Sequence, residues 1–146
     1  MKLLLEHLPA SVAIGAIGWW LSGDPLCLLV ALAAGWMIDA DHLVDFVWYL
    51  KRAGKPVGFG LLKTGGYFKL NGKVFVPLHS WEITIALMLL AAVIPDAECL
   101  LLSGSIAHGL HLIQDQLLYR VRPLGYFLIS RVRSQFTLNN FCLLTT

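Results

Sequence analysis

The sequence predicts an all-α fold, a bundle of four transmembrane helices formed by a single integral membrane domain that covers residues 1–146. Hydrophobic residues make up 58% of the chain and charged residues 14%, well below the ~25% of an ordinary soluble domain. Mean hydropathy is correspondingly high, at +0.72. The apolar residues gather in four stretches, each near the ~20 residues that cross a hydrocarbon core of ~30 Å. These stretches cover about residues 3–21, 26–50, 77–94 and 99–119.

The placement of the basic residues predicts the orientation of this bundle. All eleven Lys and Arg residues lie at the N-terminus, between the second and third stretches, or after the fourth. The other two connections contain no basic residue and carry the acids Asp24, Asp96 and Glu98. Because basic residues are enriched in cytoplasmic loops, we expect both termini to be cytoplasmic.

The first apolar stretch predicts a helix that is retained in the mature protein. Glu6 and His7 interrupt its beginning, Pro9 is compatible with the first turn of a helix, and no small-residue cleavage site follows. Gly15 and Gly18 would let a neighbouring helix approach closely.

The second apolar stretch, opened by Pro25, carries the cluster around which we expect the function to be built. Asp39 and His42 are three residues apart, and Asp41 and Asp45 are four apart, so helical geometry places them on neighbouring turns. Ionisable side chains are costly inside a membrane helix. Such a cluster therefore indicates a functional site.

The basic, glycine-rich connection over residues 51–76 predicts a β-hairpin in a cytoplasmic loop. Asn71-Gly72 stands between two β-prone arms, residues 67–70 and 73–76, and Asn-Gly is a strong hairpin signal. An open sheet cannot span a membrane, so we place the hairpin at the cytoplasmic interface over the polar cluster. It would be either a lid on the site or a surface hairpin without a role.

The third and fourth stretches add ionisable groups at helical spacing. His79 and Glu82 lie one turn apart at the start of the third stretch, and His108, His111 and Asp115 share one face of the fourth. These residues are the expected partners of the cluster in the second stretch.

The segment after the fourth stretch, residues 120–136, mixes aromatic and aliphatic residues with basic ones. This mixture predicts an amphipathic helix in the membrane interface. We expect Arg131 and Arg133 to contact anionic lipid there.

Counting along the helices predicts that the polar groups meet in the inner leaflet. At ~1.5 Å per residue, residues 39–45 lie ~20–29 Å below the outer end of their helix, and residues 108–115 lie ~14–24 Å below theirs. His7 and His79 stand at the beginning of the first and third stretches, which we expect to enter the membrane from the cytoplasmic side. We therefore predict a metal site whose ligands come from His7, Asp39, Asp41, His42, His79, His108, His111 and Asp115.

Imidazole and carboxylate donors suit zinc, with manganese or iron as alternatives, and their number allows one or two ions. Whichever of Asp45 and Glu82 does not bind metal is the candidate catalytic base. Cys27, Cys99 and Cys142 form no metal motif. Cys27 and Cys99 both fall near the outer end, where either a disulfide or two buried free thiols would fit, and free thiols are favoured.

Three short motifs stand in a fixed order along the chain: Asp39-Ala40-Asp41-His42, His79-Ser80, and His111 with Asp115. This order resembles the bacterial inner-membrane metal-dependent hydrolases of the SOS-induced type, which are distantly related to the zinc-dependent phospholipase C and single-strand nuclease superfamily. The resemblance implies metal binding by the motif residues, His7 as the family's N-terminal histidine, and an inner-membrane location. The chain departs from the family at Val74 and Phe75, which replace a His-Arg pair, and at Leu78, which replaces a threonine.

We therefore expect a membrane-embedded metal-dependent hydrolase of the phosphodiesterase or phospholipase type. A metal-activated water would cleave a phosphoester or lipid-like substrate at the cytoplasmic leaflet. The expected partners are membrane lipid and a small amphiphilic or phosphorylated substrate, with Arg120 and Arg122 near its phosphate. We expect no nucleic-acid partner.

Other functions remain open from the sequence. A non-catalytic metal- or proton-binding protein or a transporter would also carry intramembrane Asp and His, although the outer half offers mainly Ser11, Ser103 and Ser105 as polar groups. Haem ligation by two histidines would leave the carboxylates without a role. A membrane metalloprotease would lack its usual His-Glu-x-x-His motif.

Overall fold

The computed structural model describes residues 6–53, 58 and 60–142, and over these residues the fold is all-α, as predicted. No β-strand occurs in the described part of the chain. Two isolated β-bridges join Lys73 to Thr137 and Val121 to Cys142.

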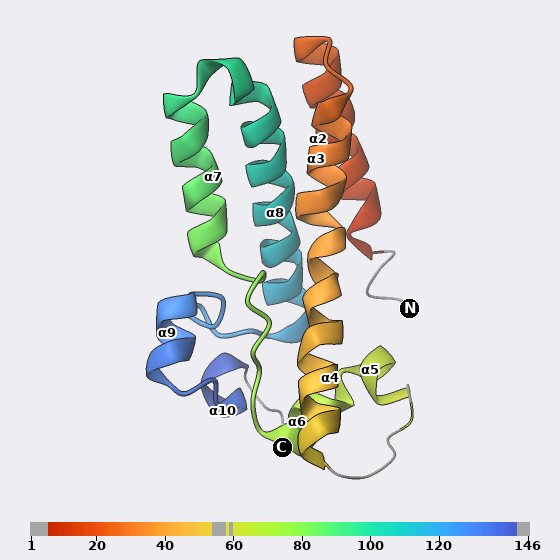
Figure 1. The fold of residues 1–146 in the computed structure, drawn as a ribbon, viewed down its shortest axis with the longest axis vertical. Helices are drawn as coiled ribbons and strands as arrows, with labels where there is room; N and C mark the ends of the chain where they lie inside the picture. The colour runs from red at the N-terminus through yellow and green to blue at the C-terminus, as the bar shows by residue number, and fades with distance from the viewer. Residues whose placement is uncertain (1–5, 54–57, 59, 143–146) are drawn as a thin grey trace.

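Two helical hairpins stand side by side, with their tight connections at the same end of the molecule (Figure 1). We call this the loop end. The first hairpin consists of α2 (Leu8–Ser22) and α3 (Leu26–Gly35). The second consists of α7 (Trp81–Val93) and α8 (Glu98–Tyr119), joined through the short 3₁₀ helix η2 (Pro95–Ala97).

The predicted close approach of α2 and α3 is present. A Cβ added at Gly15 would lie 2.6 Å from the Cα of Leu28 and 3.1 Å from the Cβ of Ala31, so only glycine allows this spacing. The thiols of Cys27 and Cys99 are free, with their Sγ atoms 3.6 Å apart, where α3 meets α8 near the loop end.

The second predicted helix, residues 26–50, is broken. Helix α3 ends at Gly35, the 3₁₀ helix η1 covers Met37–Ala40, and α4 covers Asp41–Ala53, with a bend of 45° between the two parts. Residues two apart do not share a face in a regular helix. The break is accompanied by burial of both Asp39 and Asp41, which are 8% and 3% exposed.

The helices of the described residues test the predicted membrane spans only in part. No single helix combines the length and the apolar composition that a membrane crossing requires, whereas the bent pair of residues 26–35 and 37–53 meets both conditions together. Helices α2 and α7 are apolar but only 15 and 13 residues long. The four-span bundle therefore stays a prediction.

The predicted β-hairpin is wrong. Its first arm belongs to α6 (Gly66–Asn71), which follows the short helix α5 (Gly60–Thr64). Gly72 has a φ of +67° and donates its N–H to the carbonyl of Phe68 at 2.8 Å, so Asn71-Gly72 ends a helix instead of turning between strands. The second arm is extended, and the N–H of Val74 bonds to the carbonyl of Phe136 at 2.9 Å.

The segment after α8 folds back against the other end of the bundle, which we call the metal end because the residues predicted to bind metal lie there. It contains α9 (Leu128–Arg133) and α10 (Leu138–Phe141), so the helix expected over residues 120–136 is much shorter. Arg131, expected on lipid, is 3% exposed, because the segment packs against residues 75–79. Arg133 is exposed.

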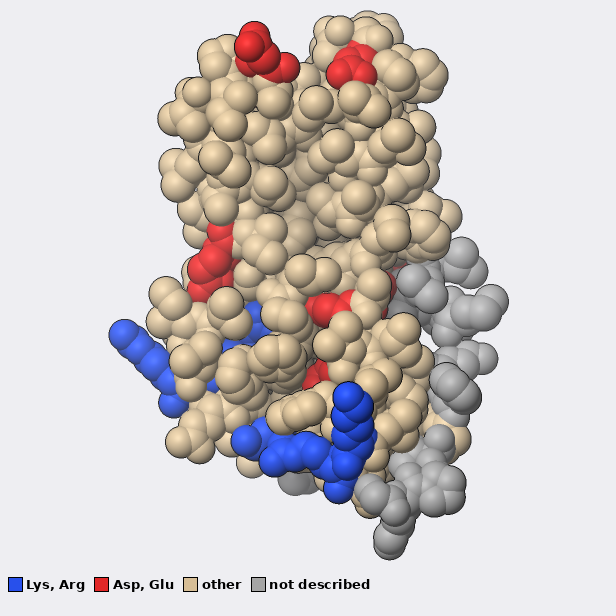
Figure 2. All heavy atoms as spheres, viewed as in Figure 1, with Lys and Arg blue, Asp and Glu red and all other residues tan. Residues whose placement is uncertain are grey.

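The two ends of the molecule differ in charge. On the face drawn in Figure 2, the half at the loop end is almost free of charged side chains except for acids at its tip, whereas Lys and Arg gather in the other half. A small core of Ile38, Leu112, Val121 and Tyr126 lies between the bundle and the C-terminal segment.

Candidate metal centre

Six of the predicted ligands converge at the metal end and come from four separate segments of the chain. Their donor atoms form two groups, within each of which all atoms lie within 4.8 Å of one another. The groups are His7 with His111 and Asp115, and Asp39 with His42 and His79. Because the Nε2 atoms of His79 and His111 lie 3.0 Å apart, the two groups form one continuous centre.

Three buried histidines of this centre are each oriented through Nδ1. His111 Nδ1 donates to the carbonyl of Gly35 at 2.8 Å, His79 Nδ1 to the carboxylate of Asp41 at 3.1 Å, and His7 Nδ1 to the amide oxygen of Gln114 at 2.9 Å. A neutral imidazole carries one N–H, so in the neutral form of each ring Nε2 would keep its lone pair and could bind a metal ion. Orientation of a histidine by an acceptor on its other nitrogen is the usual arrangement around a bound metal.

The three Nε2 atoms lie close to other nitrogen and oxygen atoms, and those of His79 and His111 are within hydrogen-bonding distance of each other. In addition to the contact between His79 and His111, His7 Nε2 lies 3.1 Å from Oδ1 of Asp115. Oδ1 of Asp39 lies 3.4 Å from Nε2 of His79 and 3.6 Å from that of His111. Such contacts are unfavourable unless a proton or a metal ion lies between the atoms.

The same atoms lack other hydrogen-bond partners. Nε2 of His7, both carboxylate oxygens of Asp39 and Oδ1 of Asp115 are buried without a hydrogen bond. Buried polar atoms are rarely left in this state. Nitrogen and oxygen donors gathered in this way could hold a metal ion.

Tyr126 fixes the remaining oxygen of Asp115. Its hydroxyl donates to Oδ2 of Asp115 at 2.9 Å. Burial, together with the negative charge of Asp115, raises the pKa of Tyr126 well above its usual value. The phenol therefore stays protonated and remains a donor.

The other two acids of the Asp39–Asp45 cluster, Asp41 and Asp45, bond to residues 75–79. The carboxylate of Asp41 accepts the Leu78 N–H at 2.9 Å and orients His79, while Asp45 is fully buried and accepts the Phe75 N–H at 3.1 Å. Neither belongs to the two groups of donor atoms.

Two further predicted site residues are engaged elsewhere. His108 Nε2 donates to the carbonyl of Leu78 at 3.0 Å, and its Nδ1 lies 2.7 Å from the hydroxyl of Thr84, so both ring nitrogens are occupied. The carboxylate of Glu82 accepts the N–H groups of Leu128 and Ile129 at 2.9 and 3.1 Å, at the start of α9.

Arg131 was not recognised as part of the site from the sequence, although it supports it. Its guanidinium donates to the carbonyls of Val76 at 2.6 Å, His79 at 2.7 Å and Phe75 at 3.4 Å. Burial lowers the pKa of Arg131, and the charge of Asp41 opposes this effect. Arg131 thus holds the segment that presents His79.

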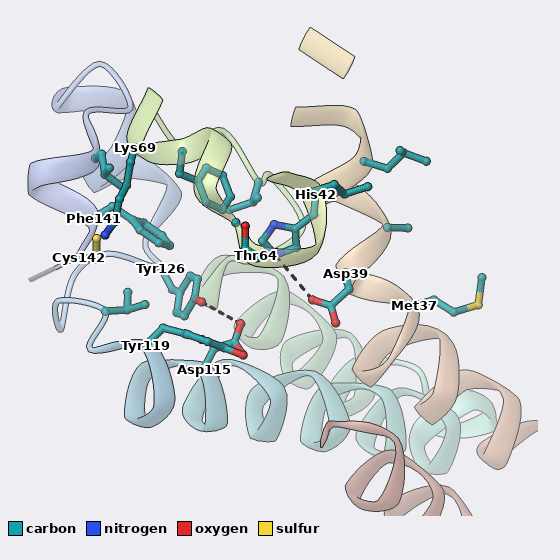
Figure 3. A pocket seen from close by; sticks show the side chains of 18 of the residues that line it. Met37, Asp39, His42, Thr64, Lys69, Asp115, Tyr119, Tyr126, Phe141 and Cys142 are labelled. Atoms are coloured by element: carbon teal, nitrogen blue, oxygen red, sulfur yellow. Dashed lines mark hydrogen bonds and ion pairs between the residues drawn. The ribbon is translucent and has the colours of Figure 1, made fainter. Parts of the chain in front are cut away.

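A cavity of about 820 Å³ adjoins the centre. Asp39, His42 and Asp115 lie on its wall, between Met37 on one side and Lys69 on the other (Figure 3). The side of the centre formed by Asp39, His42 and Asp115 therefore faces a space that can hold a small molecule.

Comparison with known proteins found no matching family model, no matching curated protein and no matching solved structure. The resemblance to the bacterial membrane hydrolases stays a prediction.

Proposed function

We propose that this protein is a membrane-embedded metal-dependent hydrolase that cleaves a phosphoester or lipid-like substrate. The observation that carries the proposal is the contact of 3.0 Å between the Nε2 atoms of His79 and His111, beside the unpaired oxygens of Asp39. Such a contact needs a proton or a cation between the two nitrogens, and the proposal assigns a metal ion to this place.

The donor set favours zinc, with manganese or iron as alternatives, and its two groups suit one or two ions. A bound ion of this kind would supply an activated water at neutral pH and would stabilise charge that develops on an ester.

Asp39 would accept a proton from the attacking water. It lines the cavity, and its Oδ2 has no hydrogen bond, whereas its Oδ1 faces the histidines. Asp45 and Glu82, the candidate bases from the sequence, are bonded to main-chain N–H groups behind the centre and at α9.

A membrane location is supported by the surface of the loop end. Large apolar side chains are exposed there, among them Trp20 at 82%, Leu21 at 67% and Val93 at 71%. Exposed apolar surface of this extent is typical of contact with lipid or a partner protein. With the basic metal end toward the cytoplasm, the centre would lie near the inner leaflet.

Transport is less well supported than hydrolysis. The hydroxyls of Ser11 and Ser105, two of the polar groups expected to line a path, donate to the carbonyls of His7 and Thr84, each at 3.0 Å. Hydroxyls engaged by the helices themselves offer little to an ion passing between them.

Metal analysis with a matched pair of variants tests the proposal. Wild-type protein purified in detergent should hold one or two equivalents of zinc, manganese or iron and hydrolyse a chromogenic phosphodiester or ester. His111→Ala should lose metal and activity. His108→Ala, at an equally buried histidine one turn away with both nitrogens engaged elsewhere, should keep the metal.

Two outcomes would contradict the proposal. Folded wild-type protein that takes up no metal after reconstitution would remove the metal centre. Stoichiometric metal without hydrolysis of phosphoesters or carboxyl esters would favour the non-catalytic metal-binding alternative.

A further inference from the structure

The cavity beside the metal centre has three zones in a fixed order. In Figure 3, Lys69 lies beside Phe141 and Cys142 at one end, and Met37 lies at the other. Asp39 and His42 lie between them. A molecule that fills the cavity therefore meets a cation, then the metal centre, then an apolar region.

The cationic zone rests on Lys69, which projects from α6 and is exposed. Among the described residues that line the cavity, Lys69 is the one lysine, and there is no arginine. No ion pair in the described part of the chain neutralises it. Its ammonium group is therefore available to an anionic group of a ligand.

The apolar zone opens to the outside of the bundle. Met37 and Leu43 line the cavity, yet they are 57% and 51% exposed. If the bundle lies in a membrane, these side chains face lipid. An alkyl chain can then extend from the cavity into the bilayer without crossing a polar surface.

Most of the remaining wall is apolar as well. It is formed by side chains from the break after α3, from α5 and α6, and from the segment after α8, including Trp36, Leu62, Phe68, Val121, Leu138 and Phe141. The cavity volume of about 820 Å³ is within the ~300–1,000 Å³ typical of sites for one small molecule. This favours a ligand with one alkyl chain over a bulkier lipid.

We propose that the cavity binds a single-chain anionic amphiphile, with its negatively charged headgroup on Lys69, its hydrolysable linkage beside Asp39 and Asp115, and its alkyl chain toward Met37 and Leu43. The position of the linkage rests on the proposed hydrolase function. In the reaction, the oxygen of water bonds to the phosphorus or acyl carbon, and the ester bond to the leaving oxygen breaks. One proton of the water passes to that leaving oxygen, so water is the only co-reactant.

Binding, measured apart from turnover, tests this inference. Full-length protein in detergent is incubated with a fluorescent fatty-acid probe, 11-(dansylamino)undecanoic acid. The probe is displaced by 1-palmitoyl lysophosphatidic acid, by 1-monopalmitoylglycerol, or by glycerol 3-phosphate. We expect lysophosphatidic acid to compete about tenfold better than monopalmitoylglycerol, and glycerol 3-phosphate not to compete.

Two variants assign the charge selectivity. Lys69→Gln should weaken the binding of lysophosphatidic acid about tenfold and leave the binding of monopalmitoylglycerol unchanged. Lys73→Gln, at the next lysine of the same segment but outside the cavity wall, should change neither. Leu43→Arg, at the end of the cavity proposed for the alkyl chain, should weaken the binding of both single-chain compounds.

Equal competition by the charged and neutral compounds, or equal effects of the two lysine variants, would overturn the inference. Metal content is measured in the same samples to separate the two proposals. Selective binding by protein that takes up no metal on reconstitution would support this ligand class while contradicting the hydrolase. Metal-loaded, hydrolytically active protein that does not bind the amphiphile would contradict this inference alone.

Discussion

Different kinds of interaction stabilise the loop end and the metal end of this protein. At the loop end, α2 and α3 approach through small residues such as Gly15 and Ala31, and apolar side chains cover the surface. At the metal end, buried histidines, carboxylates and an arginine are joined by individual hydrogen bonds, as between His111 and Gly35.

This difference predicts how each end responds to substitution. Apolar packing depends on volume and shape, and its loss changes stability. A buried polar network depends on every member, because a group that loses its partner keeps the desolvation penalty. Changes at the metal end should alter metal affinity, whereas changes at the loop end should alter stability alone.

The largest effect is expected for Arg131→Gln. Three carbonyls of residues 75–79 would lose their charged donor, and His79 would lose its support. Metal affinity should fall ~10–100-fold, the usual range for groups that position metal ligands. Isothermal titration of metal-free protein with zinc measures this change.

Arg133→Gln is the matched control, because Arg133 is exposed on the same short helix. It should leave zinc affinity unchanged. Arg131→Lys should restore part of the affinity, since lysine keeps the charge without the forked geometry. Equal affinities for Arg131→Gln and Arg133→Gln would contradict the positioning role.

At the loop end, Gly15→Ala should destabilise the protein by ~1–3 kcal/mol, because the added methyl group would meet the backbone of Leu28 at 2.6 Å. Unfolding in detergent measures the loss, with Ala16→Leu on the exposed face as a neutral control. Zinc affinity of the folded Gly15→Ala variant should match the wild type. Loss of metal from this variant would contradict the expectation that changes at the loop end alter stability alone.

The smallest effect is expected for Tyr126→Phe, which removes one hydrogen bond to Asp115 and preserves the ring. A hydrogen bond of this kind contributes ~0.5–1.5 kcal/mol, so zinc affinity should fall at most about tenfold. Phe141→Leu, at a ring that packs against Tyr126 but makes no polar contact with Asp115, serves as the comparison. An equal loss in both variants would assign the effect to packing.

The sequence was most informative about residues whose polarity conflicts with their surroundings. Imidazoles and carboxylates inside apolar stretches indicated which residues gather at the candidate metal centre, and counting along the helices correctly predicted that His111 and Asp39 meet. The same reasoning grouped His108 with the ligands, because spacing along a helix does not show that Thr84 and Leu78 engage both its nitrogens.

Features that depend on contacts distant in sequence were not predictable in this way. Asn71-Gly72 suits a hairpin turn and a helix end equally well, and only the surroundings select the latter. Arg131 resembled an interfacial cation until the fold placed its guanidinium against the carbonyls of residues 75–79. Gln114 stood next to Asp115 as a polar residue in a largely apolar stretch, a signal that could have indicated its role.

Leu78 shows how a position can support the candidate centre without using its side chain. The Leu78 side chain is 43% exposed. Its contributions come from the main chain, through an N–H to Asp41 and a carbonyl that accepts from His108. Any residue other than proline supplies the same two groups, so Leu78 can be substituted without losing either contact, and alanine scanning will pass over a position that the network uses.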